Sequence, residues 1–96
     1  MDHKINASIQ IIPKSENSDI YALVDKAILV IRNSGLKHIV TPMETIVEGT
    51  YEEVMDVFRK ANEAVLPHAD ELIVFIKLHI NASRDVTFEE KTHKWS

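Results

Sequence analysis

The chain has 96 residues, which is enough for one domain with one hydrophobic core but not for two. Hydrophobic residues make up 45% of it and charged residues 27%, so the composition predicts an ordinary folded domain rather than a disordered segment. The net charge is −4 and the Lys and Arg residues are scattered singly, which argues against nucleic acid as the main partner.

Two features that the sequence lacks restrict the cellular compartment that we expect for this protein. The chain has no cysteine, which excludes disulfides, thiolate metal sites and cysteine nucleophiles. Its N-terminal residues lack an apolar signal core, and no apolar run is long enough to span a membrane. We therefore expect a cytoplasmic protein that does not insert into membranes.

The chain opens with a strand pattern that is followed by a helix pattern. In residues 5–12 apolar and polar side chains alternate, as in a strand with one buried face, and we expect Pro13 to end it. Across residues 19–33 apolar side chains recur every three or four positions, which predicts an amphipathic helix. Ser18 or Asp19 can cap the N-terminus of this helix.

A glycine, a hairpin and a second helix come next. Gly35 stands where helices commonly end in a left-handed residue. Strands at 37–41 and 45–48 are close enough in sequence to pair as an antiparallel hairpin. Thr50 and Glu53 then form a capping-box pattern, which predicts the start of a helix that should end before the next proline.

The last part of the chain predicts one long strand and one short helix. Residues 71–81 alternate between a wholly apolar side and a side that carries Ile73 and Phe75. A second capping-box pattern at 87–90 predicts a short C-terminal helix that ends near Trp95. The predicted order is therefore β-α-β-β-α-β with a short helix added at the C-terminal end.

This order predicts a single domain over residues 1–96 with the ferredoxin-like α+β fold, a four-stranded antiparallel sheet with two helices on one face. The wholly apolar side of the last strand should meet the helices. The open face would then carry Ile73, Phe75, Ser8, Gln10 and Ile12. Large apolar side chains on an open face indicate self-association into a dimer or tetramer, unless Trp95 and the C-terminal tail fold over that face.

Four segments together resemble the thiamine-binding protein family. They are Ser8-Ile9-Gln10-Ile11-Ile12-Pro13, Tyr21 with Val24-Asp25-Lys26-Ala27, Ser34-Gly35-Leu36, and Pro42-Met43-Glu44-Thr45-Ile46-Val47-Glu48-Gly49. The last segment is the most specific, and the resemblance covers residues 5–91. The resemblance implies a ferredoxin-like fold, oligomerisation through the sheets, and binding of thiamine or its hydroxymethylpyrimidine precursor without chemistry.

Five residues are candidates for binding an aminopyrimidine, which needs hydrogen-bonding groups along its edge and an apolar surface for its faces. They are Ser8, Gln10, Ser34, Thr45 and Glu48. Glu48 is the sharpest candidate because a carboxylate can accept a hydrogen bond from an exocyclic amine, although it could equally favour the dipole of the helix that follows. The other four have structural explanations as well, since hydroxyl and amide side chains also serve strands, helix ends and interfaces.

No catalytic or metal site is predicted. The five histidines show no HxxH or HExxH spacing, and the sequence has no nucleophile motif. We therefore expect no cofactor and no enzyme activity. Two alternatives remain: a dimeric α/β-barrel enzyme of the isomerase or monooxygenase type, in which only His38 or His79 could act as acid or base, and a regulatory or structural module that binds another protein through its open sheet.

Overall fold

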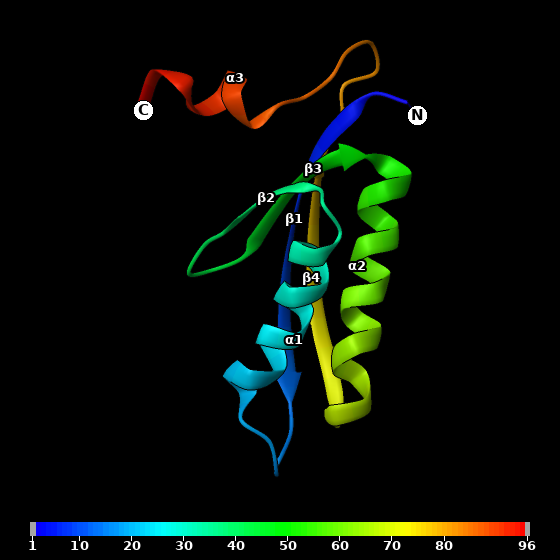
Figure 1. The fold of residues 1–96 in the computed structure, drawn as a ribbon, viewed down its shortest axis with the longest axis vertical. Coiled ribbons are helices and arrows are strands. Elements are labelled where there is room, and N and C mark those ends of the chain that lie inside the picture. Colours follow the sequence, from blue (N-terminus) through cyan, green and yellow to red (C-terminus); the bar gives the residue numbers. More distant parts are fainter. Residues whose placement is uncertain (1, 96) are drawn as a thin grey trace.

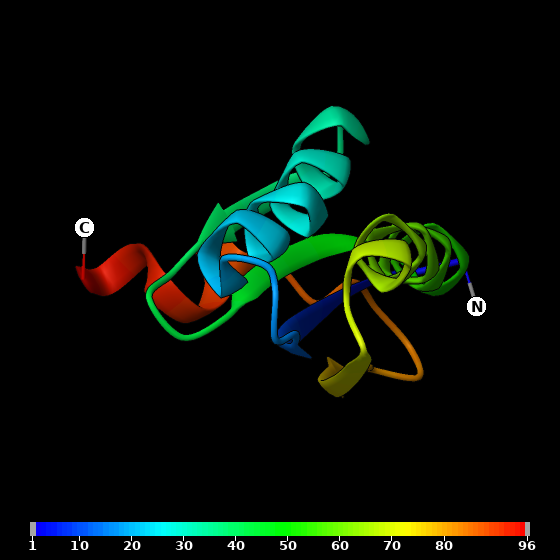
Figure 2. The same ribbon diagram turned by 90° about the horizontal axis from the view of Figure 1, so that it is seen from below.

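The structure, a computed structural model, describes residues 2–95. Its elements are β1 (Lys4–Lys14), α1 (Ile20–Asn33), β2 (Lys37–Val40), β3 (Thr45–Thr50), α2 (Tyr51–Val65), η1 (Leu66–His68), β4 (Glu71–His79), α3 (Phe88–Thr92) and η2 (His93–Trp95). The strands form one antiparallel sheet in the order β2-β3-β1-β4, and α1 and α2 cover one face of it (Figures 1 and 2). This confirms the predicted ferredoxin-like fold. Within residues 2–95 no helix combines the length and apolar character needed to cross a membrane.

Both long helices begin at predicted capping residues, and α1 ends just before the predicted glycine. Asp19 is the N-cap of α1, where its side chain accepts a hydrogen bond from the backbone N–H of Tyr21 at 2.9 Å. Gly35, just beyond α1, has a φ of +80°, in the left-handed region that favours glycine. Thr50 and Glu53 form the capping box of α2 with both reciprocal hydrogen bonds present. These local signals therefore decide where the two long helices begin.

The first strand is longer than its pattern predicts. We expected Pro13 to end it, but β1 continues to Lys14, and Pro13 pairs with Leu72 of β4. β1 pairs with β3 only from Lys4 to Ile9, so its last residues have a neighbouring strand on one side only. A proline is tolerated there because it has no backbone N–H to donate, and no second neighbouring strand requires one at this position.

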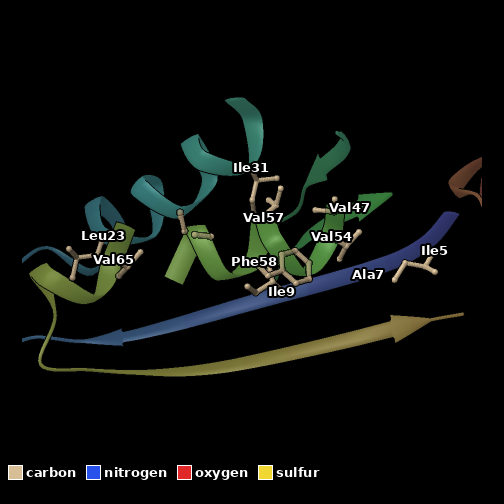
Figure 3. Close-up of a cluster of buried hydrophobic side chains, with 12 residues drawn as sticks. Ile5, Ala7, Ile9, Leu23, Ile31, Val47, Val54, Val57, Phe58 and Val65 are labelled. Carbon is tan, nitrogen blue, oxygen red and sulfur yellow. The ribbon is translucent and has the colours of Figure 1, made fainter. Parts of the chain in front are cut away.

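The hydrophobic core lies between the sheet and the two long helices (Figure 3). Its residues come from β1, α1, β3 and α2: Ile5, Ala7, Ile9, Leu23, Ala27, Ile31, Val47, Val54, Val57, Phe58, Ala61 and Val65. Phe58 is only 1% exposed, and removing a ring of this kind from a core costs about 3–5 kcal/mol. This packing makes the sheet a rigid support for whatever lies on its other face.

The last strand is less covered than we predicted. Its wholly apolar side was expected to meet the helices, but only Leu72 and Val74 pack against the core. On the same side Ile76 and Leu78 are 38% and 39% exposed. The reason is that α2 packs on β1 and β3, while β4 lies on the side of β1 away from the two long helices (Figure 3). The strand also ends at His79, two residues earlier than predicted.

The C-terminal segment folds back over one end of the open face. Val86 is fully buried, and its backbone N–H donates to the carbonyl of Lys4 at 2.9 Å. The capping box predicted at 87–90 is present and starts α3, which lies near the end of the sheet at which β1 begins (Figure 1). Trp95 is 78% exposed, which shows that it does not pack on the open face, and Phe75 at the other end of that face is 57% exposed. The tail therefore covers only part of the open face.

Candidate functional site

The open face carries a pocket of about 420 Å³ beneath α3. Its lining comes from every strand and from α3, and includes Asn6, Ser8, Ile46, Lys77, Phe88 and Lys91. Pockets that bind small molecules typically measure about 300–1,000 Å³ and combine an apolar lining with a few placed polar groups. This cavity, the open-face pocket, has both properties.

Two buried polar side chains of β1 form the floor of the open-face pocket. Ser8 is 7% exposed and Asn6 is 5% exposed. The side-chain Nδ2 of Asn6 donates to Oε1 of Glu48 at 3.2 Å and to the carbonyl of Val86 at 3.1 Å. Its Oδ1 is buried and accepts no hydrogen bond from the described part of the chain. An unpaired buried acceptor costs about 1–3 kcal/mol, so a ligand that donates a hydrogen bond to this oxygen would recover that cost.

An ion pair crosses the open face beside this floor. The Nζ of Lys77 lies 3.4 Å from Oε1 of Glu44, and both residues line the pocket. Ser8 pairs with Lys77 on one side and with Ile46 on the other, so Lys77 is a cross-strand neighbour of Ser8. Lys77 is 77% exposed, and exposed ion pairs contribute little stability. A ligand can therefore separate this pair at small cost.

Glu48 stands next to the open-face pocket but is occupied by contacts within the chain. It is 7% exposed, and its Oε1 accepts the backbone N–H of Phe88 at 2.6 Å as well as Nδ2 of Asn6. Its Oε2 lies 3.9 Å from the Nζ of Lys37. Hydrogen bonds to a carboxylate are stronger than neutral ones, so Glu48 holds the first residue of α3 against the sheet. The geometry makes it a residue that positions the wall of the pocket.

Thr45 and Gln10 border a different cavity, of about 230 Å³, between α1 and the loop at 41–44. Thr45 lies on the helix side of β3, opposite the core residue Ile9. At the mouth of this helix-side pocket Tyr21 is 83% exposed. Its volume falls below the usual range for small-molecule sites.

Ser34 lies apart from the open-face and helix-side pockets and borders a separate cavity of about 340 Å³ between α1 and α2. It follows the last residue of α1, where its Oγ donates to the carbonyl of Ile31 at 2.5 Å and accepts the N–H of Leu36 at 3.1 Å. These bonds satisfy backbone groups at the end of the helix. Of the five predicted site residues, Ser8 alone lines the open-face pocket.

The two histidines of the enzyme alternative do not come together. His38 lies in β2 on the helix side of the sheet, with its Nδ1 2.9 Å from the carbonyl oxygen of Leu36. His79 lies in β4 on the open face, opposite Asn6. β2 and β4 are the two outer strands of the sheet, so these rings are on opposite faces and at opposite edges. Among residues 2–95, no group of three or more His, Cys, Asp or Glu side chains could hold a metal ion.

The sequence motifs and the fold both agree with those of known proteins. Residues 7–96 match the family described as thiamine-binding protein. The chain belongs to the thiamine-binding protein family. A UPF0045 protein of Clostridium perfringens is 35% identical over 91 residues, which cover 94% of this chain and 95% of that protein. A second relative, a UPF0045 protein of Methanocaldococcus jannaschii, is 30% identical over 88 residues, or 92% of this chain and 88% of that protein.

Comparison with solved structures shows that the likeness extends from the sequence to the backbone fold. A domain of unknown function, DUF77, from Bacillus cereus superposes with a TM-score of 0.94 at 36% identity, over 98% of this chain and 91% of that chain. A Thermotoga maritima protein, whose name proposes a role in thiamine biosynthesis or salvage, has a TM-score of 0.87 at 30% identity, over 97% and 99% of the two chains. The predicted fold and family are therefore confirmed.

Several residues that line the open-face pocket were not among the predicted ones. They are Asn6, Glu44, Lys77, Phe88 and Lys91. Asn6 had a readable signal, because it shares the strand face of Ser8 and asparagine is depleted in strands. Phe88 and Lys91 are three residues apart and so share one side of a helix, but no local pattern says which part of the sheet that helix covers.

Proposed function

We propose that this protein binds thiamine or its hydroxymethylpyrimidine moiety reversibly, without catalysis, in the open-face pocket. The observation that carries the proposal is the buried Oδ1 of Asn6, an acceptor unpaired within residues 2–95, next to the hydroxyl of Ser8. An aminopyrimidine offers an exocyclic amine that can donate to Oδ1 and ring nitrogens that can accept from the hydroxyl. Phe88 and Ile46 supply apolar surface for the faces of the ring.

The pocket offers one carboxylate, that of Glu44, to a ligand that extends beyond the pyrimidine, beside the ammonium groups of Lys77 and Lys91. Thiamine also carries a positively charged thiazolium ring, and the carboxylate of Glu44 lines the same pocket. Because the partner of Glu44, Lys77, is 77% exposed, its ammonium can turn to solvent with little loss. The volume of about 420 Å³ lies within the usual range for such ligands. The family name points to the same class of ligand.

We also infer that the protein works as a dimer or tetramer in the cytoplasm. Ile73 and Phe75 are 40% and 57% exposed on the part of the open face that α3 leaves uncovered. Exposed apolar side chains that gather on one face are typical of protein interfaces. The lack of cysteine fits a reducing compartment.

Isothermal titration with thiamine, and separately with hydroxymethylpyrimidine, tests the binding proposal. We expect saturation near one ligand per chain. Ser8→Ala removes one hydrogen bond to the ligand and should weaken binding about fivefold, which corresponds to about 1 kcal/mol. Thr45→Val is the matched control, because it also removes a hydroxyl from a buried strand position but on the helix side of the sheet. Its affinity should equal that of the wild type.

Each outcome of this titration decides a separate point. No saturable heat with either ligand would overturn the proposed function. If Thr45→Val weakens binding while Ser8→Ala does not, the ligand occupies the helix-side pocket and the proposed location is wrong. Mass spectrometry of the recovered ligand after long incubation tests the absence of catalysis, since any conversion would favour the enzyme alternative.

A further inference from the structure

The lining of the open-face pocket carries more ammonium groups than carboxylates. Lys77 and Lys91 line it together with one carboxylate, that of Glu44, and the pair of Lys37 and Glu48 stands just outside it. With the lining histidine taken as neutral, two positive charges and one negative charge give this lining a net charge of +1. The chain as a whole has a net charge of −4, so the positive charge is a local feature. A positive pocket on an acidic protein favours an anionic group of the ligand.

Lys91 supplies the positive charge that is not balanced within the pocket. The Nζ of Lys77 lies 3.4 Å from Oε1 of Glu44, whereas Lys91 forms no ion pair within residues 2–95. Its neighbour in sequence, Glu90, accepts hydrogen bonds from the guanidinium of Arg84 at 3.0 Å and 3.2 Å. The ammonium of Lys91 is therefore available to an anion that enters the pocket.

The fold places the two ammonium groups on different sides of the pocket. Lys77 belongs to β4, where it is the cross-strand neighbour of Ser8 on the floor. Lys91 belongs to α3 and shares one side of that helix with Phe88. The backbone N–H of Phe88 donates to Glu48 at 2.6 Å, which fixes α3 and so keeps Lys91 at the pocket wall. A ligand whose ring lies on the floor can thus extend a second group between a lysine of the sheet and a lysine of α3.

We propose that the open-face pocket selects the phosphorylated form of its ligand, a pyrimidine whose side arm carries a phosphate monoester held between Lys77 and Lys91. This rests on the proposed function, because the floor must bind the pyrimidine. The hydroxyl groups of hydroxymethylpyrimidine and of thiamine can both carry such an ester. Near pH 7 a phosphate monoester has a charge of about −1.5 to −2 and three strong acceptor oxygens, enough to accept from two ammonium groups at once.

The ion pair of Lys77 and Glu44 adds a second level of selection. Lys77 is 77% exposed, so its ammonium can move to the phosphate at small cost and leave the carboxylate of Glu44 without its partner. The thiazolium ring of thiamine phosphate would then meet that carboxylate, whereas the phosphate of hydroxymethylpyrimidine brings no cation to it. Unphosphorylated thiamine instead adds a positive charge to a lining that is already positive. Thiamine phosphate should therefore bind more tightly than the other three ligands.

Isothermal titration with two matched pairs of ligands tests this selection. The pairs are hydroxymethylpyrimidine with its phosphate, and thiamine with its monophosphate. In each pair we expect the phosphorylated ligand to bind about tenfold more tightly. In Lys91→Gln this ratio should fall to about threefold, because one of the two ammonium groups is lost. Raising the salt concentration from about 0.05 M to about 0.5 M should also lower the ratio, since ions screen exposed charges.

The control is Lys94→Gln, which makes the same change in net charge a few residues further along the chain. Lys94 does not line the pocket, and its Nζ lies 5.2 Å from the centre of the ring of Trp95. Its ratio should therefore equal that of the wild type. An unchanged ratio in Lys91→Gln would overturn the assigned phosphate contact.

The remaining outcomes separate this proposal from the proposed function. Equal affinities within both pairs would remove the selection for phosphate and leave the proposed function standing. Inorganic phosphate that binds as tightly as the phosphorylated pyrimidines would also overturn the proposal, because the ring would then contribute nothing. No saturable heat with any of the four ligands would remove the proposed function itself. If thiamine phosphate binds no more tightly than the phosphate of hydroxymethylpyrimidine, the role given to Glu44 is wrong.

Discussion

Glu48 joins the floor of the open-face pocket to α3, and replacing it with alanine tests that link. In Glu48→Ala the N–H of Phe88 and the side-chain amide of Asn6 lose an acceptor that lies 2.6 Å and 3.2 Å away, respectively. Both residues are buried, at 7% and 5% exposure, so water cannot readily take the place of the carboxylate. The contact with Lys37 adds little, because that lysine is 58% exposed and 3.9 Å distant.

The expected loss of stability follows from these two hydrogen bonds. A hydrogen bond to a charged group contributes about 1.5–3 kcal/mol, and a buried donor left unpaired costs about 1–3 kcal/mol. Nδ2 of Asn6 keeps its hydrogen bond to the carbonyl of Val86, so Glu48→Ala loses the full bond at Phe88 and only part of the second, and should lower the free energy of unfolding by about 2–4 kcal/mol. For a domain of this size that corresponds to a fall in Tm of roughly 10–25 °C. Glu48→Gln keeps an acceptor oxygen but loses the charge, so it should cost only about 1 kcal/mol.

Urea unfolding followed by circular dichroism measures this loss, with Asp25→Ala as the control. Asp25 is an exposed carboxylate in the middle of α1, so its removal should change the unfolding free energy by no more than about 0.5 kcal/mol. Ligand affinity should fall together with stability in Glu48→Ala, because Phe88 and Lys91 of α3 line the open-face pocket. If Glu48→Ala unfolds like Asp25→Ala, the carboxylate does not hold α3 and the reasoning is wrong.

Three further perturbations test the caps and the open face. Gly35→Ala should lower the free energy of unfolding in urea by about 1 kcal/mol, because φ at this position is +80°. An added Cβ would meet nothing within 4 Å, so backbone strain is the whole of the expected cost. An unchanged urea midpoint would contradict this. The hydrogen bond from the backbone N–H of Thr50 lowers the pKa of Glu53 in the folded protein. At a pH above the pKa of a glutamate in the unfolded chain, this ionised carboxylate therefore stabilises the fold in full. The stabilisation is lost as the pH falls through the lowered pKa of the folded state. As the pH falls from about 5, the wild type should lose more stability than Glu53→Gln, and parallel losses would remove the capping bond as the cause. Phe75→Lys should lower the assembly mass measured by light scattering, whereas an unchanged mass would count against an interface on this part of the open face.

The sequence by itself determined the elements, their order and the family. Asp19, Gly35 and the Thr50–Glu53 box act within a few residues of themselves, so their effect on the backbone can be read without knowing the rest of the fold. The alternation of period two likewise places Thr45 and Glu48, three residues apart, on opposite faces of one strand. The fold class followed because two helices and four strands in this order have few ways to bury their apolar sides.

Only the tertiary structure decided which of these faces carries the pocket and what closes it. Glu48 meets Phe88 from 40 positions away along the chain, and Asn6 meets Val86 from 80 positions away. Such contacts depend on where the C-terminal segment folds back, which no local pattern encodes. The exposure of β4 has the same origin, since its apolar side meets the helices only where they lie over that strand. Local interactions therefore determined the helices and strands, whereas contacts between distant parts of the chain determined the site.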